Sequence, residues 1–213
     1  MHMTTTGLRE RQRQRTHEAI QDAATKLFLE SGFHDVGVDA IAAAAEVSKR
    51  TLFKYFSSKE DLVIGAFADH VDEPARVVLS CSPDQSPLTA LHDYFQDGLT
   101  RRDPVTGLDD RPQTLAFVNM VLSVPSLQAR LLLYQYNAEE ALEHALCQVR
   151  TSTGEETAHL AACQTFAVLR GLADDNRKHL VGGKTAEEHY PSAVAAAQRG
   201  FRILRHGLAE SFG

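Results

Sequence analysis

The chain has 213 residues, and its hydrophobic fraction of 43% is enough for a packed core in one large or two small domains. No run of about 18 apolar residues occurs, so the sequence gives no sign of a membrane-spanning helix. Cys81, Cys147 and Cys163 are odd in number and lack C-x-x-C spacing. They argue against a disulfide framework or a zinc ribbon and for a reducing cytoplasm. A net charge of −6 argues against a protein that coats nucleic acid nonspecifically.

The charge is unevenly placed along the chain. Residues 1–60 hold nine Lys and Arg against eight Asp and Glu, whereas residues 61–213 hold thirteen against twenty. One basic cluster is the four arginines of residues 9–15, and residues 49–59 contain a second. Two basic clusters on an acidic chain are typical of a protein that contacts a polyanion with one end. Alternatively, they form solvated faces.

The periodicity of the first 60 residues is helical. Apolar residues at positions 20, 23, 24, 27 and 28 share one face and predict a helix over about 13–30, which Ser31-Gly32 ends. A second short helix is predicted at about 39–45, and a third runs from the N-cap Ser48 to about residue 55. This spacing is that of a helix-turn-helix. The sequence Ser58-Lys59-Glu60-Asp61 predicts the start of a fourth helix, close to a capping box.

The rest of the chain also reads as helices, about nine in total, so the predicted fold class is all-α. The fourth helix runs from about 59 toward 79 with an interruption near Pro74, because proline removes a helix hydrogen bond. Ser86-Pro87 starts a fifth over 88–101. Residues 103–110 are expected to be a surface loop. Further helices are predicted at 112–122, at 127–149, from a capping box at Thr153 to about 178, and at about 191–210.

One ordered series of residues resembles the DNA-binding domain of the TetR family. It comprises Gly32-Phe33, Ile41-Ala42 and the continuous run Ala45-Glu46-Val47-Ser48-Lys49-Arg50-Thr51-Leu52-Phe53-Lys54-Tyr55-Phe56-Ser57-Ser58-Lys59-Glu60-Asp61-Leu62. The resemblance implies a three-helix DNA-binding domain at 1–57, with a flexible basic arm at 1–12, and a larger helical ligand-binding and dimerisation domain at 58–213. It implies a homodimer on palindromic double-stranded operator DNA, most simply a repressor released by an unknown small-molecule effector; a regulator without a small-molecule ligand is the alternative. Since no apolar run is long enough to span a membrane, no membrane association is expected.

The third helix supports a DNA-binding role on physical grounds. Val47, Leu52 and Phe56 can pack inward, which leaves three cations and an aromatic residue outward. Lys and Arg on such a helix can donate to guanine in the major groove and neutralise phosphates. By position, the resemblance assigns base or nearby phosphate contacts to Lys49, Arg50 and Lys54, and backbone contacts to Thr51, Phe53, Tyr55 and Lys59. For Tyr55, a place at the edge of the core is the alternative.

Three residues depart from the family pattern. Gly37 replaces a usual Thr or Ser before the second helix, so a phosphate-binding hydroxyl and N-cap are missing. Glu46 stands at a tight-turn position often held by Gly, which requires a positive φ from a residue that disfavours it. Phe53 replaces a usual Tyr and cannot donate a hydrogen bond. These departures weaken the expected phosphate clamp, and the basic arm is a candidate for compensating.

The resemblance also implies a dimer interface and a ligand pocket. Interface candidates on the last two helices are Phe166, Leu169, Ala193, Ala196, Ala197, Phe201 and Leu204, with the subunit's own core as the alternative. Candidate ligand residues are His92, Tyr94, Phe95, Phe117, Met120, Arg130 and Tyr134. Ordinary core packing is the alternative for the aromatic residues, and solvation for the arginine.

Other classes of protein are poorly supported. Gly183-Lys184-Thr185 resembles the end of a P-loop, but the position five before it is Lys178 and a helix precedes it. Ten histidines include no H-x-x-x-H or H-E-x-x-H pair, so neither a metal site nor a cofactor is predicted. No catalytic constellation is recognisable, and an enzyme is not expected. A helical protein–protein adaptor remains as an alternative, but it would need no cationic third helix.

Overall fold

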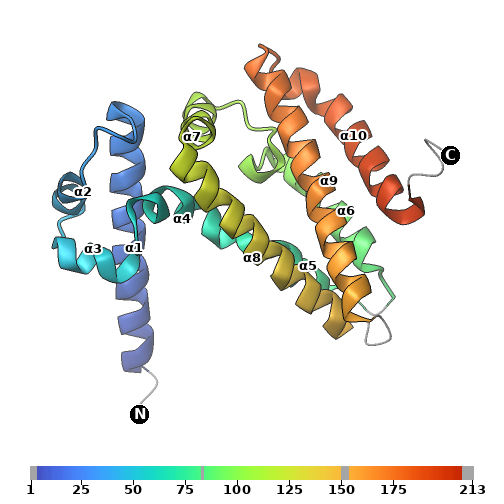
Figure 1. Cartoon of the computed structure of the whole chain (residues 1–213), viewed down its shortest axis with the longest axis horizontal. Coiled ribbons are helices and arrows are strands. Elements are labelled where there is room, and N and C mark those ends of the chain that lie inside the picture. Colours follow the sequence, from blue (N-terminus) through green and yellow to red (C-terminus); the bar gives the residue numbers. More distant parts are fainter. Residues whose placement is uncertain (1–3, 83, 150–153, 208–213) are drawn as a thin grey trace. The chain divides into compact units, whose positions relative to one another are not determined.

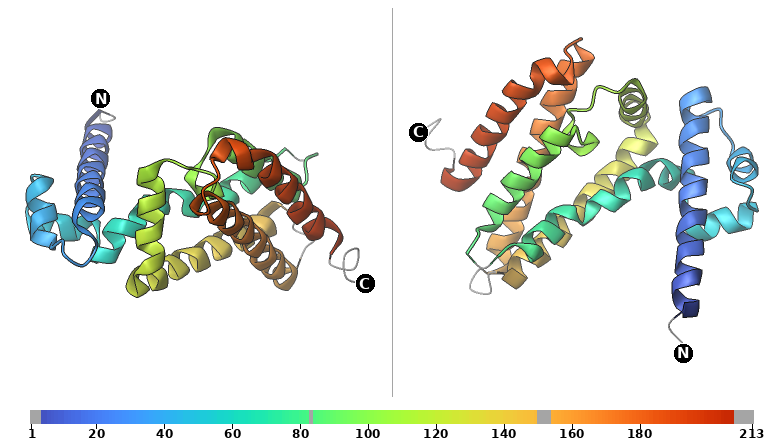
Figure 2. Two further views of the ribbon diagram at one scale, coloured as in Figure 1. Left: turned by 90° about the horizontal axis from the view of Figure 1, so that it is seen from above. Right: turned by 180° about the vertical axis from the view of Figure 1, so that it is seen from behind.

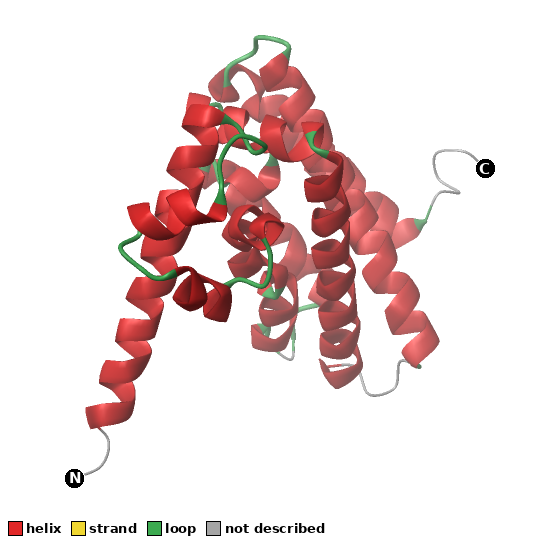
Figure 3. Ribbon diagram, turned by 60° about the vertical axis from the view of Figure 1, so that its left-hand side comes forward, coloured by secondary structure: helices red, strands yellow, loops and turns green. Residues whose placement is uncertain are grey.

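The computed structural model describes residues 4–82, 84–149 and 154–207, and within these ranges it contains helices and turns but no strand (Figures 1 and 3). The predicted all-α class is therefore confirmed. The helices are α1 Thr4–Ser31, α2 Val38–Ala44, α3 Lys49–Tyr55, α4 Lys59–Val71, α5 Glu73–Ser80, α6 Pro87–Arg101, the 3-10 helix η1 Pro104–Thr106, α7 Pro112–Ser123, α8 Pro125–Val149, α9 Glu155–Val181 and α10 Ala186–His206.

The predicted interruption near Pro74 divides one expected helix into two. α4 ends at Val71, and α5 begins at Glu73 with Pro74 in its first turn. Proline fits there because the first N–H groups of a helix have no partner within it. This division accounts for ten described α-helices where the sequence predicts about nine.

The first helix begins earlier than the sequence predicts. α1 starts at Thr4 and not near Arg13, so residues 4–12 are helical where a flexible arm is expected. Residues 9–15 alternate Arg with Gln and Glu, which are good helix formers, and their side chains are exposed. A helical turn whose side chains are all exposed shows no apolar periodicity, so the periodicity of the sequence did not reveal where α1 begins. Residues 1–3 of the predicted arm lie outside the described residues.

The last two helices also differ at their starts. α10 begins at Ala186 instead of near Pro191, because Thr185 and Glu188 form a reciprocal capping box. The Glu188 amide donates to Thr185 Oγ1 over 3.2 Å, and the Thr185 amide donates to Glu188 Oε2 over 2.8 Å. Pro191 lies inside this helix. The predicted cap at Thr153 and the predicted end at Glu210 fall outside the described residues.

Contacts divide the chain into two compact units that do not follow chain order. Unit 1 consists of residues up to 68 together with 116–132, and unit 2 consists of 69–115 together with 133–213. The predicted domain boundary after residue 57 falls within unit 1. The start of α4 packs into this unit, since Leu62, Val63 and Ile64 are fully buried and a Cβ on Gly65 would lie 3.1 Å from the Phe56 ring.

Unit 2 has its core where α6, α9 and α10 meet. α9 and α10 run side by side, and α10 also packs against α6 (Figure 2). The buried apolar side chains of this core include Leu91, Leu99, Leu142 and Phe201. Burial of such side chains contributes about 1.5–3 kcal/mol each before entropy is counted, so this cluster stabilises unit 2.

Residues 103–110 are only in part the surface loop that the sequence predicts, because Pro104–Thr106 forms η1 and several side chains of the segment are buried. Leu108 is fully buried, Asp109 is 3% exposed, and the buried Asn176 amide donates to the Thr106 carbonyl over 2.8 Å. Gly107 has φ +72°, and a Cβ there would lie 2.0 Å from the Ala173 carbonyl oxygen. The polar composition suggested exposure, but the buried polar groups of this segment form hydrogen bonds inside unit 2.

Asp109 shows how a carboxylate is accommodated at this buried turn. Burial alone would raise its pKa, but hydrogen bonds from the Arg111 side chain and backbone and from Thr114 lower it. The carboxylate therefore stays ionised and holds the start of α7.

Among the described residues, no single helix combines the length and apolar character needed to cross a membrane. α7 and α8 reach that composition only when taken together, and the chain bends by 98° between them.

Candidate nucleic-acid interface

The turn between α2 and α3 confirms the predicted helix-turn-helix and its strained position. Glu46 has φ +55°, as its place in the turn requires. The Val47 amide donates to the Ala42 carbonyl over 2.9 Å, and the Glu46 amide donates to that of Ala43 over 3.1 Å. This pair of bonds is a Schellman motif, which ends α2 with a left-handed residue and sets the direction in which α3 leaves.

α3 has one buried side and one exposed side. Ser48 caps its start, because its Oγ accepts the Thr51 amide over 3.0 Å. Leu52 is fully buried and Phe56 is 4% exposed, which anchors the helix to the core of unit 1. The outward side chains are Lys49, Arg50, Phe53 and Lys54. Arg50 and Lys54 are four residues apart and so share a face, and neither makes an ion pair within the described ranges.

Lys49 differs from the other two cations of α3 because it has a partner. Its Nζ lies 3.0 Å from Oδ2 of Asp39 in α2, and both side chains are more than half exposed. An exposed pair of this kind contributes about 0–1 kcal/mol and is screened by salt. The ion pair links α3 to α2, and it neutralises Lys49, one of the cations predicted to contact DNA.

Two of the residues predicted to contact the DNA backbone, Thr51 and Tyr55, make contacts within unit 1. The Thr51 hydroxyl lies 2.8 Å from the Ser48 hydroxyl. Tyr55 is half-buried, with its ring centroid 6.3 Å from that of His17, which stacks on Phe56 at 4.6 Å. Tyr55 thus lies at the edge of the core, the alternative noted from sequence, while Phe53 is 45% exposed.

Lys59 lies over aromatic rings at the start of α4. Its Nζ is 4.4 Å from the Phe33 ring centroid and 5.8 Å from that of Phe28. The ammonium group is half-buried and held by the ring faces. Lys59 is also the first residue of α4, and the start of a helix favours a phosphate.

A buried ion pair holds the same helix start from the other side. Arg130 of α8 donates from Nε to Asp61 Oδ1 over 2.5 Å, and the Ser57 hydroxyl donates to Asp61 Oδ2 over 2.7 Å. The Asp61 amide donates to Ser58 Oγ over 3.1 Å, which confirms the predicted capping serine. Arg130 therefore has a defined structural role in unit 1, which its assignment to a ligand pocket did not anticipate.

α1 contributes further cations that were not among the individual residues predicted to contact DNA. Its arginines at positions 9, 11, 13 and 15 are exposed. Arg13 precedes His17 by four residues, so both lie on the face of α1 that contacts the end of α3. Arg13 is identified as a candidate for DNA binding by its i, i+4 spacing to His17, the residue that contacts Tyr55.

Gly37 is the N-cap of α2 and, as predicted, provides no side-chain cap. Its φ of −84° is accessible to any residue, and a Cβ built there meets nothing within 4 Å. Glycine is thus not required by the backbone at this position.

The predicted ligand residues are divided between the two units. Phe117, Met120 and Arg130 belong to unit 1, whereas the other four belong to unit 2, namely His92, Tyr94, Phe95 and Tyr134. Phe95 is buried in the core of unit 2, and the His92 ring lies 4.9 Å from that of Phe201.

Tyr94 forms a polar contact inside unit 2. Its hydroxyl donates to the carboxylate of Glu73, which also bonds His70. Burial and the neighbouring carboxylate raise the pKa of Tyr94, so the phenol stays protonated. Burial would raise the pKa of Glu73, but the hydrogen bonds from Tyr94 and His70 lower it.

Three predicted interface residues belong to the subunit's own core. Ala193, Ala197 and Phe201 are at most 1% exposed, so they have no surface to offer to a partner. This matches the alternative noted from the sequence. The other candidates, Phe166, Leu169, Ala196 and Leu204, are half-buried and keep some accessible surface.

Comparisons with known proteins agree with this arrangement. Residues 20–66 match the sequence model of the family described as bacterial regulatory proteins, tetR family. The transcriptional regulator TcmR of Streptomyces glaucescens is 33% identical over 129 residues, which are 59% of this chain and 56% of TcmR. The chain thus spans little more than half the length of this relative.

Two solved structures share the fold. NalD of Pseudomonas aeruginosa, the secondary repressor of a multidrug efflux pump, aligns with 88% of this chain and 97% of its own at a TM-score of 0.55 and 19% identity. A complex of SmeT with triclosan aligns with 92% and 91% at a TM-score of 0.55 and 16% identity. Regulatory proteins of this type are a non-enzymatic class, as the sequence predicts. Residues 20–66 thus match the helix-turn-helix of the tetR family, and the chain shares its fold with these two solved structures.

Proposed function

We propose that the chain binds double-stranded DNA through α3 and regulates transcription. The observation that carries this proposal is the exposed face of Arg50 and Lys54 on a short helix that is capped by Ser48 and anchored by Leu52. Lys and Arg in this position can donate to guanine O6 and N7, while Phe53 and the α1 arginines lie against the DNA backbone. The partner is specific operator DNA, since the acidic remainder of the chain would repel nonspecific contacts.

Selection from a random duplex library, followed by anisotropy titration at several salt concentrations, tests this function. We expect one enriched sequence, with affinity that falls steeply as salt rises. Arg50→Ala and Lys54→Ala should each weaken binding by about 1–3 kcal/mol and lower the salt slope by about 1. Arg199→Ala removes the same charge from an exposed position of α10 and is the matched control. Equal effects of Arg50→Ala and Arg199→Ala, or no enriched sequence, would refute the proposal.

The regulator is further proposed to be a homodimer on a palindromic operator. Support comes from the half-buried apolar residues of α9 and α10, such as Leu169, which are suited to an interface. Sedimentation should give twice the 23.4 kDa chain mass, and Leu169→Arg should shift the protein toward a monomer. A footprint should show two half-sites about 34–36 Å apart. A monomeric wild type would contradict the assembly but not the DNA-binding surface.

We also propose that a small-molecule effector releases the protein from DNA, as a cytoplasmic repressor. Two proteins of the same fold support this: NalD is a repressor, and SmeT forms a complex with the small molecule triclosan. α4 and α8 each contribute residues to both units, so either helix can connect an effector site in unit 2 with unit 1. Such coupling is commonly about 1–3 kcal/mol and reciprocal, so an effector found by screening must bind more weakly to the DNA-bound protein. Equal affinity for both forms would exclude this mechanism.

A further inference from the structure

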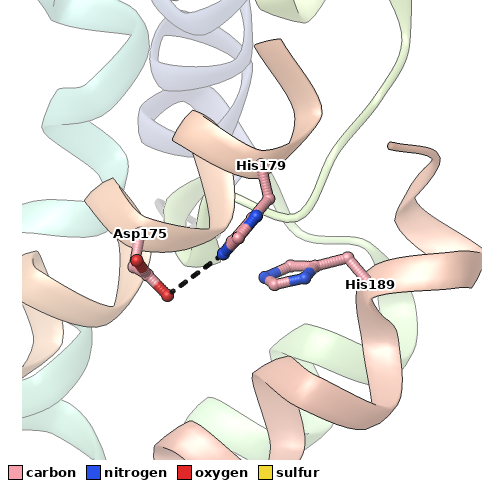
Figure 4. Close-up of side chains that lie close together, drawn as sticks. All are labelled: Asp175, His179 and His189. Carbon is pink, nitrogen blue, oxygen red and sulfur yellow. Dashed lines mark ion pairs between the residues drawn. The ribbon is translucent and has the colours of Figure 1, made fainter. Parts of the chain in front are cut away.

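Three potential metal ligands meet where α9 ends and α10 begins. Asp175 and His179 lie one turn apart on α9, and His189 lies near the start of α10 (Figure 4). One ligand atom from each residue lies within 4.8 Å of the other two. Asp175 Oδ2 is 3.9 Å from His179 Nε2, and the two imidazole ring centroids are 4.2 Å apart. All three residues belong to unit 2.

His189 is the unusual member of this group. Its side chain is 2% exposed, yet neither Nδ1 nor Nε2 has a hydrogen-bond partner among the described residues. The other buried polar side chains at this corner are satisfied: Asn176 donates to the Thr106 carbonyl, and Asp109 accepts from Arg111. A buried polar group without a partner costs about 1–3 kcal/mol, so such a group indicates an interaction that protein atoms do not provide.

The surroundings of His189 favour a metal ion as that interaction. Its ring is buried against that of His179, and no polar protein atom among the described residues reaches either of its nitrogens. A neutral imidazole offers a ring-nitrogen lone pair, which is the form that coordinates metals. Asp175 provides a negative charge on the open side, because its side chain is 59% exposed and that of His179 is 42% exposed. An ion can thus enter from solvent and reach the buried ring.

We propose that Asp175, His179 and His189 bind a divalent transition-metal ion of the Zn²⁺ type. Two imidazoles and one carboxylate are a ligand set that zinc uses, with water in the fourth position. Bonds of about 2.0–2.2 Å would place tetrahedral ligands about 3.4 Å apart, so the ligand atoms, now within 4.8 Å of one another, must approach by up to about 1.4 Å. Asp175 and His179 can do so by rotation, since both are exposed. The ion would then tie the last turns of α9 to α10 across Gly182 and Gly183.

A second group of ligand-type atoms in unit 2 provides an internal control. Cys163 Sγ lies 3.7 Å from His159 Nε2 and 3.8 Å from Glu139 Oε2. His159 is exposed and its Nδ1 already lies 2.8 Å from Glu143 Oε2. This group leaves no buried polar atom without a partner, so it carries no proposal, but metal added to the protein could bind there.

The test uses the full chain, stripped of metal with a chelator and titrated with Zn²⁺ by calorimetry and with Co²⁺ by visible absorption. We expect one ion per chain, an increase in Tm on metal addition, and at least about tenfold weaker binding in each of Asp175→Asn, His179→Gln and His189→Leu. His189→Leu should fold without metal, since it fills the same space with no unpaired nitrogen, and circular dichroism checks this.

His159→Gln should bind metal like the wild type. The proposal is overturned if His189→Leu binds as tightly as the wild type, if the wild type binds no stoichiometric ion, or if His159→Gln abolishes binding. None of these readouts involves DNA, so the outcome is independent of the DNA-binding proposal.

Discussion

The ion pair between Asp61 and Arg130 determines how firmly the start of α4 is held in unit 1. The Asp61 side chain is 7% exposed and that of Arg130 is 33% exposed, with 2.5 Å between Nε and Oδ1. Replacing one partner of a fully buried pair costs about 3–5 kcal/mol, and an exposed pair contributes about 0–1 kcal/mol. Because the guanidinium is one-third exposed, we expect Arg130→Met to lower the free energy of unfolding by about 2 kcal/mol.

The matching variant Asp61→Asn completes a double-mutant cycle. It removes the charge but keeps an oxygen that can accept from Ser57, so we expect a loss of about 1–2 kcal/mol. In the double variant, part of both losses should be recovered, giving a coupling energy of about 1 kcal/mol. Arg199→Met, on the exposed face of α10, is the control for removing an arginine.

The pH dependence of this pair has a defined sign. Burial alone would raise the pKa of Asp61, but hydrogen bonds from Ser57, Arg130 and Ser58 lower it below the usual 3.8. A carboxylate with a lowered pKa in the folded state stabilises above its unfolded pKa of about 3.9, and this contribution disappears as pH falls through the folded value. The difference between wild type and Asp61→Asn should therefore be constant above about pH 5 and shrink below about pH 4.

Urea unfolding followed by circular dichroism measures these differences, since the chain has no Trp. If the two units unfold in separate transitions, hydrogen exchange identifies the transition that belongs to unit 1. A free energy of unfolding for Arg130→Met within about 0.5 kcal/mol of that for Arg199→Met at neutral pH would refute a stabilising ion pair. An unchanged difference between wild type and Asp61→Asn at acidic pH would refute the lowered pKa of Asp61.

Three further substitutions test the interface and its support. Gly37→Ser should stabilise α2 by about 0.5–1 kcal/mol, through an N-cap and a less flexible unfolded chain, and should tighten DNA binding if its hydroxyl reaches a phosphate; unchanged thermal unfolding would contradict it. Asp39→Asn frees Lys49, so operator affinity measured by anisotropy should rise up to about fivefold at low salt, with no rise at high salt. Gly107→Ala places a methyl group 2.0 Å from the Ala173 carbonyl at φ +72°, and we expect a loss of at least about 3 kcal/mol in denaturant unfolding. A near-neutral result would show that η1 can move away from α9.

The helix-turn-helix was predictable because its signals are local. Ser48 as an N-cap, the positive φ of Glu46 and the inward spacing of Leu52 and Phe56 each depend on a few neighbouring residues. The break near Pro74 is of the same kind. Such signals involve the backbone and its own turn, and distant packing seldom overrides them.

The errors came from long-range packing and from polar residues. The burial of Thr106, Leu108 and Asp109 depends on packing against Asn176 and Ala173, about 70 residues away, and polar composition alone cannot show it. The start of α10 was recoverable from Thr185 and Glu188, whose capping-box spacing was outweighed by Pro191. The group of Asp175, His179 and His189 was missed because a search for paired histidines within one helix does not detect ligands on two helices.

Cations that look equivalent in the sequence differ in the partners that they have in the structure. Lys49 pairs with Asp39, Lys59 lies over Phe33, and Arg130 neutralises a buried carboxylate. A cation held by a partner must give up that contact, or share it, before it can bind DNA or a ligand.

Arg50 and Lys54 carry no such cost, because each is exposed and makes no ion pair among the described residues. Discrimination between DNA sequences should therefore depend most on these two side chains, whereas Lys49 and Lys59 should affect affinity more uniformly across sequences.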